Sequence, residues 1–244
     1  MKPYYQDDFV TLYHGDAIEL APMIPRADAI VTDPPYGETA LEWDRWPDGW
    51  PEAMTNIAPQ MWCFGSMRMF FDKSAEFASW KLAQDIVWEK HNGSNVANDR
   101  FRRVHELALH FYRGEWSALR CEVPRTGDER RKQNIRRGKT PHLGMLGDES
   151  AIEGRRIMAS VIFANSCHGY AVNETQKPEA IVAPLIEYSV PPGGTVVDLF
   201  AGSGTVGACA RKTGRKAILI EKRESQCIEI VKRLAQGDLL AGVA

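Results

Sequence analysis

Short apolar runs alternate with segments of helical spacing along the first 112 residues of the chain. The runs are rich in β-branched and aromatic residues, while the segments between them place apolar residues three or four positions apart. The expected strands are FVTLYHG (9–15), DAIVTD (28–33), QMWCFGS (60–66), DIVWEK (85–90) and VHELALHFYRG (104–114), and the expected helices lie at 16–24 and around 67–81. This alternation is typical of an α/β fold with a mostly parallel sheet and helices on both faces.

Residues 113–160 break this rhythm, because they are rich in Arg, Gly and Pro and poor in apolar periodicity. A loop of this length inside a compact domain is usually functional or mobile. Between Arg120 and His142, eight Lys or Arg stand against three acids, although the whole chain has a net charge of -2. One basic segment in a nearly neutral protein favours the docking of a polyanion there, and a solvated loop without a partner is the alternative.

Regular spacing returns with a helix expected over 178–190, followed by a strand, a glycine-rich turn, a helix, a strand and a final helix. In this unit Gly202, Gly204 and Gly207 have the GxGxxG spacing between a strand and a helix. Glycines permit a tight turn, so that backbone N–H groups and the helix N-terminus can approach a nucleotide-like ligand. Glu221 follows Gly202 by 19 residues, at the end of the next strand, where an acid can bind ribose hydroxyls.

Both a dinucleotide and S-adenosylmethionine fit the glycine turn, and two features favour the second ligand. Only 23 residues follow Glu221, whereas a dinucleotide domain usually needs further parallel strands for its second half. Asp198 adds a carboxylate at the strand end, which suits the cationic methionyl group better than a pyrophosphate.

Composition bounds the class of protein. The 44% hydrophobic and 25% charged content is that of a globular protein, and 244 residues suit one domain carrying an insertion. No apolar run reaches the roughly 18 residues of a membrane span, and the N-terminus lacks the apolar stretch of a secretory signal, so we expect a cytoplasmic protein. The five cysteines form no CxxC pair, which predicts reduced thiols and no metal site.

The expected strand at 28–33 runs into Asp33-Pro34-Pro35-Tyr36, which has two interpretations. Pro and Gly commonly end strands and Asp tolerates turns, so the segment can be an ordinary loop. Alternatively, the two prolines fix the backbone and hold a carboxylate and a carbonyl at defined positions. Open α/β sheets bind ligands at the carboxyl ends of their strands, which would bring this segment beside the glycine turn.

DPPY together with DLFAGSGT resembles the amino-group DNA methyltransferases, which methylate adenine N6 or cytosine N4. DPPY comes before FAGSGT with the basic region between them, and this order is similar to that of the β group of the family. The resemblance covers residues 9–112 and 173–235. It includes Thr175-Gln176-Lys177-Pro178, which is similar to the family's TQKP segment, although Asn173-Glu174 replaces the usual His-Pro.

The resemblance implies a Rossmann-like S-adenosylmethionine-dependent methyltransferase fold with a mostly parallel seven-stranded sheet. The C-terminal strands would lie beside residues 9–15, and VHELALHFY would be the antiparallel strand on the opposite side. Residues 1–112 and 161–244 would form the catalytic and cofactor-binding domain, and residues 113–160 the irregular target-recognition insertion. The implied substrate is double-stranded DNA, and a homodimer associated with the nucleoid is expected.

The resemblance also assigns residue roles. The catalytic residues would be Asp33, Pro34, Pro35 and Tyr36: the Asp33 carboxylate and the Pro34 carbonyl hold the amine, and Tyr36 stacks on a base flipped out of the duplex. The implied cofactor-binding residues are Asp16, Ala17, Asp33, Lys177, Asp198, Phe200, Ala201, Gly202, Ser203, Gly204, Thr205 and Glu221. The residues expected to contact DNA are Arg100, Arg102, Arg103, His105, Arg120, Arg125, Arg130, Arg131, Lys132, Arg136, Arg137 and Lys139.

Several reactions remain open at this point. Adenine N6 is preferred over cytosine N4 because the clamp begins with Asp and not Ser. Methylation of cytosine C5 is disfavoured, since that family uses a Pro-Cys dipeptide and no cysteine here follows a proline. A dinucleotide-dependent oxidoreductase would leave DPPY and the basic region unused, and a catalytically silent DNA-binding protein would leave Asp33 and the glycines without a role.

The loop after the clamp, residues 37–50, carries Trp43, Trp46 and Trp50 among acids. Core packing is expected for at least two of these tryptophans. A lid over the cofactor or the flipped base is the alternative.

Overall fold

The computed structural model describes residues 2–94, 98–126, 139–140, 144–145, 156–167 and 176–241. The chain divides into two compact units, one formed by Met1–Glu122 and Ser160–Ala244 and the other by Val123–Ala159. In the smaller unit, two short antiparallel pairs are described: β7 (Arg125–Thr126) with β10 (Arg156–Ile157), and β8 (Lys139–Thr140) with β9 (Gly144–Met145).

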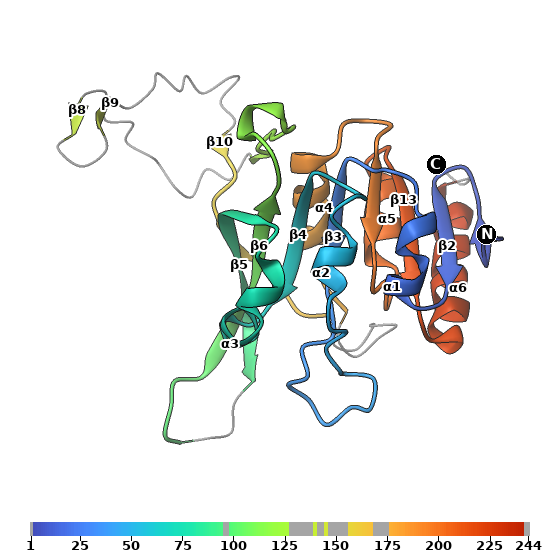
Figure 1. The fold of residues 1–244 in the computed structure, drawn as a ribbon, viewed down its shortest axis with the longest axis horizontal. Helices are drawn as coiled ribbons and strands as arrows, with labels where there is room; N and C mark the ends of the chain where they lie inside the picture. The colour runs from blue at the N-terminus through green and yellow to red at the C-terminus, as the bar shows by residue number, and fades with distance from the viewer. Residues whose placement is uncertain are drawn as a thin grey trace. The chain divides into compact units, whose positions relative to one another are not determined.

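The larger unit is built on one sheet with the strand order β1-β2-β13-β12-β3-β4-β6-β5-β11 (Figure 1). Its strands are β1 (Tyr5–Gln6), β2 (Val10–His14), β3 (Ala29–Thr32), β4 (Gln60–Gly65), β5 (Lys81–Ser94), β6 (Arg103–Tyr112), β11 (Val161–Phe163), β12 (Thr195–Asp198) and β13 (Lys216–Glu221). Strands β2, β13, β12, β3 and β4 are parallel neighbours, whereas β6 runs antiparallel to both β4 and β5.

This topology confirms the expected α/β class and the mostly parallel sheet. The C-terminal strand β13 pairs with β2 near the N-terminus, and Figure 1 shows these two strands together with helix α6 at one end of the sheet. The antiparallel strand β6 is on the opposite side, as expected. Beyond the seven expected strands, the described residues add β1 and β11, which are too short to leave a periodic signal in the sequence.

The helices are short in the first half of the chain and longer near its end. They are α1 (Ala17–Leu20), α2 (Trp50–Ala53), α3 (Met67–Asp72), α4 (Glu179–Ser189), α5 (Thr205–Lys212) and α6 (Glu224–Ala241), with 3-10 turns at Ala21–Met23, Ser74–Phe77 and Trp116–Ala118. Helix α4 contacts β3, α5 contacts β12 and β13, and α6 contacts β13 and β2.

The helix expected around residues 67–81 is shorter in the structure. Ser66 caps α3 through a 3.0 Å hydrogen bond from the Met69 N–H to its hydroxyl, as its N-terminal position predicts. At Lys73 the backbone leaves the helical region (φ -106°, ψ 10°), and the 3-10 turn that follows places Phe77 in the core. The strand β5 then begins at Lys81, so one helix becomes a helix and a turn.

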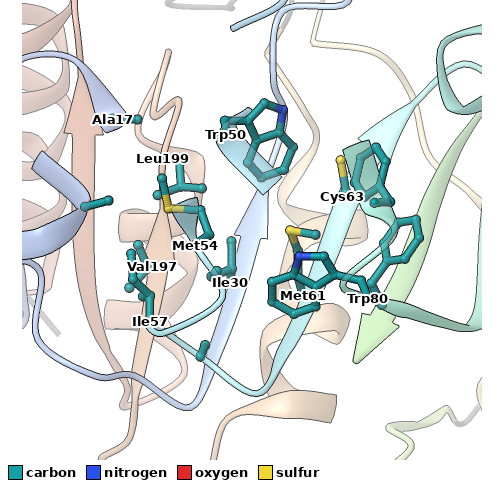
Figure 2. Close-up of a cluster of buried hydrophobic side chains, with 14 of the residues drawn as sticks. Ala17, Ile30, Trp50, Met54, Ile57, Met61, Cys63, Trp80, Val197 and Leu199 are labelled. Atoms are coloured by element: carbon teal, nitrogen blue, oxygen red, sulfur yellow. The ribbon is translucent and has the colours of Figure 1, made fainter. Parts of the chain in front are cut away.

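The central strands are fully buried because helices and loops cover both faces of the sheet. Every residue of β3 and β4 is buried, which fits continuous apolar runs and not the alternation of a half-exposed strand. Figure 2 shows Ile30, Met61 and Val197 of neighbouring strands packed with Met54 and Trp50 from the segment between β3 and β4. This core fixes the ends of β3 and β12 with respect to each other.

No helix in the described part of the chain is long and apolar enough to cross a membrane. Within the same residues, no group of three or more His, Cys, Asp or Glu is placed to hold a metal ion.

Candidate active site

A cavity of about 950 Å³ opens at the carboxyl ends of β2, β13, β12 and β3 in the larger unit. Parallel strands that end at one edge of a sheet place their following loops together, and this edge is where α/β proteins bind ligands. The DPPY segment and the glycine turn, which are far apart in sequence, therefore share one cavity. The sequence-predicted residues that line it are Asp16, Ala17, Asp33, Pro34, Pro35, Tyr36, Lys177, Asp198, Phe200, Ala201, Gly202, Ser203, Thr205 and Glu221.

Gly204 does not line the cavity but shapes the turn that does. It precedes α5 with a left-handed backbone (φ 72°), and its N–H donates to the Ala201 carbonyl at 2.7 Å. A Cβ atom at this position would lie 3.0 Å from Cγ2 of Ile230 on α6. Glycine is therefore required both by the backbone conformation and by the close approach of α6.

Glu221 ties the glycine turn to the end of β13. The Gly202 N–H donates to Glu221 Oε2 at 2.8 Å, and the Arg223 N–H donates to Oε1 at 2.8 Å. The carboxylate is nearly buried, with 6% of the residue exposed, yet it forms part of the cavity wall. It is thus fixed in orientation by two backbone donors while its remaining lone pairs can receive hydroxyl donors.

Asp198 ends β12 in a buried position of the same wall. Its Oδ1 accepts hydrogen bonds from the Thr32 hydroxyl at 2.9 Å and from the Phe200 N–H at 3.2 Å. Burial raises the pKa of Asp198 to about 7, against the weaker opposing effect of these hydrogen bonds. The group can therefore change its charge near neutral pH, and a cation in the cavity would favour its ionised form.

Asp16 begins α1 at the far side of the glycine turn. Its Oδ1 accepts from the Ile18 N–H at 2.9 Å as a helix cap, and its Oδ2 lies 3.0 Å from Lys222 Nζ. Cap and ion pair hold the side chain at the cavity wall.

Asp33 follows β3 directly and has both carboxylate oxygens engaged. The Tyr36 hydroxyl donates to Oδ1 at 2.5 Å, and Lys177 Nζ lies 2.5 Å from Oδ2. Burial raises the pKa of Asp33, with Lys177 opposing this effect and Glu106 adding to it. Burial also raises the pKa of Tyr36, and the Asp33 charge raises it further, so the phenol stays protonated.

Lys177 was expected among the cofactor-binding residues, and the structure places it between two elements. Its carbonyl accepts a 3.3 Å hydrogen bond from the Thr205 hydroxyl at the start of α5, while its ammonium group reaches Asp33. The side chain is only 8% exposed. The neighbouring residues 173–175 lie outside the described residues, so the expectation for Asn173, Glu174 and Thr175 has no structural counterpart here.

Two charged residues of the site are absent from the sequence expectations. Glu106 on β6 places Oε2 3.4 Å from Lys177 Nζ, and Lys90 on β5 donates to Glu106 Oε1. Burial alone would raise the pKa of Glu106, but Lys177 and Lys90 outweigh it and lower the pKa to about 2. A lone acid inside the apolar strand VHELALHFY is the sequence signal that could have indicated this position.

The loop that follows the clamp is closed by Asp44, whose carboxylate accepts from the N–H groups of Gly37 and Thr39 at 2.8 and 2.7 Å. Trp50 is fully buried in the core and Trp46 packs against that core, so two of the three tryptophans behave as expected. Trp43 lines the cavity instead, with the Arg223 guanidinium 4.8 Å from its ring centroid.

The residues expected to contact DNA are placed less uniformly. Arg103 lines the cavity and its Nη1 lies 3.9 Å from Glu38 Oε2, while Arg100, Arg102 and His105 are exposed near it in the chain. Arg120 pairs with Glu122 in the larger unit, and Arg125 belongs to the smaller unit. Lys139 lies in β8 with only its backbone described, and the residues outside the described ranges are Arg130, Arg131, Lys132, Arg136 and Arg137.

Curated relatives of the chain are restriction-system methyltransferases. It is 27% identical over 269 residues to the Type II methyltransferase M.HinfI of Haemophilus influenzae, which covers 96% of this chain and 70% of that protein. It is 26% identical over 267 residues to the Type II methyltransferase M.ScaI of Streptomyces caespitosus, covering 96% and 84%.

Solved structures of the same fold include M1.HpyAVI in complex with S-adenosylmethionine, with a TM-score of 0.64 at 21% identity over 92% of this chain and 98% of that one. The cytosine-N4-specific PvuII DNA methyltransferase gives a TM-score of 0.64 at 16% identity, over 91% and 85% of the two chains. A third neighbour, a DNA modification methylase of Thermus thermophilus complexed with S-adenosylmethionine, gives 0.56 at 18% identity over 92% and 93%.

These likenesses confirm the expected fold, and a sequence profile identifies the family. The profile of N6/N4 DNA methylases matches residues 27–232, which include the clamp, the glycine turn and most of α6. The chain therefore belongs to the N6/N4 family of DNA methylases.

Proposed function

We propose that this protein transfers a methyl group from S-adenosylmethionine to N6 of adenine in double-stranded DNA. The observation that carries the proposal is the position of Asp33: its carboxylate, at the end of β3, lines the same cavity as the glycine turn and Glu221. A group that receives an amine and a group that holds a nucleoside cofactor thus face one space, as direct transfer requires.

The cavity suits S-adenosylmethionine by its chemistry. Glu221 would accept hydrogen bonds from the ribose hydroxyls, Asp198 would face the cationic methionyl group, and Asp16 would receive the adenine end. The glycine turn leaves room for close backbone approach, because Gly204 has no Cβ to separate the turn from α6. When bound, the cofactor supplies an electrophilic methyl group, whose bond to sulfur breaks as its bond to the amine nitrogen forms.

Asp33 and the Pro34 carbonyl would prepare the amine. The lone pair of an exocyclic amine is delocalised into the base, so the nitrogen is a weak nucleophile. Two acceptors fixed by consecutive prolines can draw the two N–H groups out of the ring plane and aim the lone pair at the donor. After transfer, the nitrogen carries an extra proton, and the Asp33 carboxylate is its nearest proposed acceptor.

The base must leave the duplex to reach this clamp, because its amine is otherwise paired and stacked. Tyr36 lines the cavity beside Asp33 and would offer its ring to the flipped base while its hydroxyl holds Asp33 in place. The basic residues of β6 and of the smaller unit, residues 123–159, would contact the surrounding phosphates. We propose target recognition as the role of that unit.

Cytosine N4 is the second candidate target. One of the structural neighbours with a TM-score of 0.64 is a cytosine-N4-specific methyltransferase, so the fold accommodates either base. Asp at the first clamp position favours adenine within the proposal. A homodimer stays a prediction, which sedimentation velocity of the purified protein would check.

Single-molecule sequencing of DNA from cells that express the protein tests base, atom and site together. We expect N6-methyladenine at one recognition sequence, absent from cells that express Asp33→Ala. The purified Asp33→Ala variant should still bind S-adenosylmethionine in calorimetry, which separates lost chemistry from lost folding. N4-methylcytosine would establish the second candidate, and DNA without either modification would contradict the proposal.

A further inference from the structure

The proposed amine acceptor is not open in this structure. Tyr36 occupies Oδ1 of Asp33 and Lys177 occupies Oδ2, both at 2.5 Å. Charge-assisted hydrogen bonds of this kind are among the stronger polar contacts in proteins. An incoming amine therefore has to compete with an ammonium group for the same carboxylate.

Lys177 has a second carboxylate within reach. Its Nζ lies 3.4 Å from Glu106 Oε2, and that oxygen is buried without a hydrogen-bond donor. A buried acceptor that lacks a donor is costly and ordinarily finds a partner. Glu106 Oε2 is thus a place where Lys177 can gain a hydrogen bond as it gives up the bond to Asp33.

Lys90 holds this second carboxylate in place from the other side. It donates to Glu106 Oε1, and its ammonium group lies 4.4 Å from the ring centroid of Trp88. The four groups alternate in charge along the row Lys90, Glu106, Lys177, Asp33. Because both carboxylates flank Lys177, a small movement of its ammonium group keeps it ion-paired throughout.

We propose that Lys177 is a positioning residue that moves from Asp33 to Glu106 when the target amine binds, and that Glu106 is the residue that receives it. The inference rests on the proposed role of Asp33 as amine acceptor. In the resting state Lys177 neutralises Asp33 in its buried site. In the substrate complex the amine N–H takes over at Asp33, and Lys177 completes the hydrogen bonding of Glu106.

A purely structural ion pair would predict a different response to mutation. If Lys177 and Glu106 only stabilised the fold, the loss of Glu106 would lower the melting temperature without a specific effect on chemistry. If Glu106 is the alternative partner, its loss leaves Lys177 on Asp33 and slows methyl transfer. Substrate and cofactor binding would then be largely retained.

The test compares Glu106→Gln, Glu106→Gln combined with Lys177→Met, and the matched control Glu89→Gln, which changes an exposed acid on β5 outside the cavity wall. Single-turnover transfer of tritiated methyl from S-adenosylmethionine to unmethylated plasmid DNA is measured from pH 6 to 9, with cofactor affinity by calorimetry. We expect Glu106→Gln to lower the transfer rate at least tenfold while the cofactor dissociation constant changes less than threefold. Glu89→Gln should match the wild type.

The double variant distinguishes a blocked acceptor from a damaged site. Without Lys177 the acceptor is open again, so the double variant should exceed Glu106→Gln several-fold at pH 9, where Asp33 is ionised without its cation. A wild-type rate in Glu106→Gln, or a double variant no faster than Glu106→Gln at any pH, overturns the inference. Absence of transfer by the wild type would instead contradict the proposed function.

Discussion

The Thr32 hydroxyl donates a 2.9 Å hydrogen bond to Oδ1 of Asp198 and joins the ends of β3 and β12 at the base of the cavity. The same hydroxyl oxygen accepts a 3.3 Å hydrogen bond from the Leu199 N–H. One side chain on the clamp strand thus orients the carboxylate on the cofactor strand. Asp198 remains buried, and burial raises its pKa to about 7.

Cofactor affinity should therefore depend on pH through Asp198. Below pH 7 the carboxyl is mostly protonated in the free protein, and a cationic ligand has to displace that proton. We expect the association constant of S-adenosylmethionine to rise about tenfold per pH unit up to about pH 7 and then to level off. Calorimetry across pH 5.5–8.5 measures this dependence, and Asp198→Asn should bind weakly with no such slope. An unchanged slope in the variant would assign the dependence to another group.

Stability of the ligand-free protein should show the opposite trend for the same group. A carboxyl whose pKa is raised by folding contributes most below its unfolded value near 3.8, and this contribution is lost as the pH rises to about 7. Asp198→Asn keeps a hydrogen-bond acceptor for Thr32 and removes the charge. Its free energy of unfolding, relative to wild type, should be about 2 kcal/mol more favourable at pH 8 than at pH 5. Urea denaturation at the two pH values checks this, and an equal difference at both would contradict the assigned pKa.

The sequence predicts the parts of the site that have local signals. The apolar run that ends at Asp33, the proline pair and the glycine spacing around Gly202 are all written within a few residues, because strand ends and tight turns depend on local backbone preferences. Their convergence on one cavity follows from parallel pairing of β3 and β12. Local backbone chemistry and the rules of parallel sheets are therefore sufficient to predict these features.

The charged row beside Asp33 has no such local signal. Glu106, Lys90 and Lys177 come from β6, β5 and the segment before α4, and only the register of the antiparallel pair and the course of the chain bring them together. Trp43 is similar, since its contact with Arg223 joins the clamp loop to the end of β13. Tertiary proximity of this kind cannot be inferred from periodicity or from composition.

Two glycines with nearly equal backbone conformations separate crowding from backbone strain. Gly204 and Gly214 have φ of 72° and 69°, but a Cβ at Gly204 would meet Ile230 whereas nothing lies within 4 Å of a Cβ at Gly214. Gly214→Ala should cost about 1 kcal/mol of unfolding free energy, and Gly204→Ala about 1–2 kcal/mol more. Chemical denaturation gives both values, and equal losses would show that α6 moves away freely.

Trp43 and Trp46 should differ in what their loss affects. The Trp46 indole donates to Glu76 at 2.7 Å and packs against Trp50 and Phe77, so Trp46→Ala should lower the free energy of unfolding by about 2–3 kcal/mol. Trp43 lines the cavity, and Trp43→Ala should leave stability within about 1 kcal/mol while weakening cofactor binding several-fold. Thermal unfolding with and without S-adenosylmethionine measures both effects. A large loss of stability in Trp43→Ala would place that residue in the core instead.

Arg102 should contribute to DNA affinity through charge and not through sequence. It is exposed on the segment that leads into β6, beside the cavity edge marked by Arg103. A phosphate contact releases counterions, so Arg102→Ala should lower the slope of log affinity against log salt by about 1, to a similar extent on specific and non-specific duplexes. Lys216→Ala is the matched control, because this exposed residue begins β13 and lies at the opposite edge of the parallel strands. Fluorescence anisotropy from about 50 to 200 mM salt measures both slopes. An equal change in the control would mean that only the overall charge matters, and a loss confined to one sequence would indicate that Arg102 reads a base.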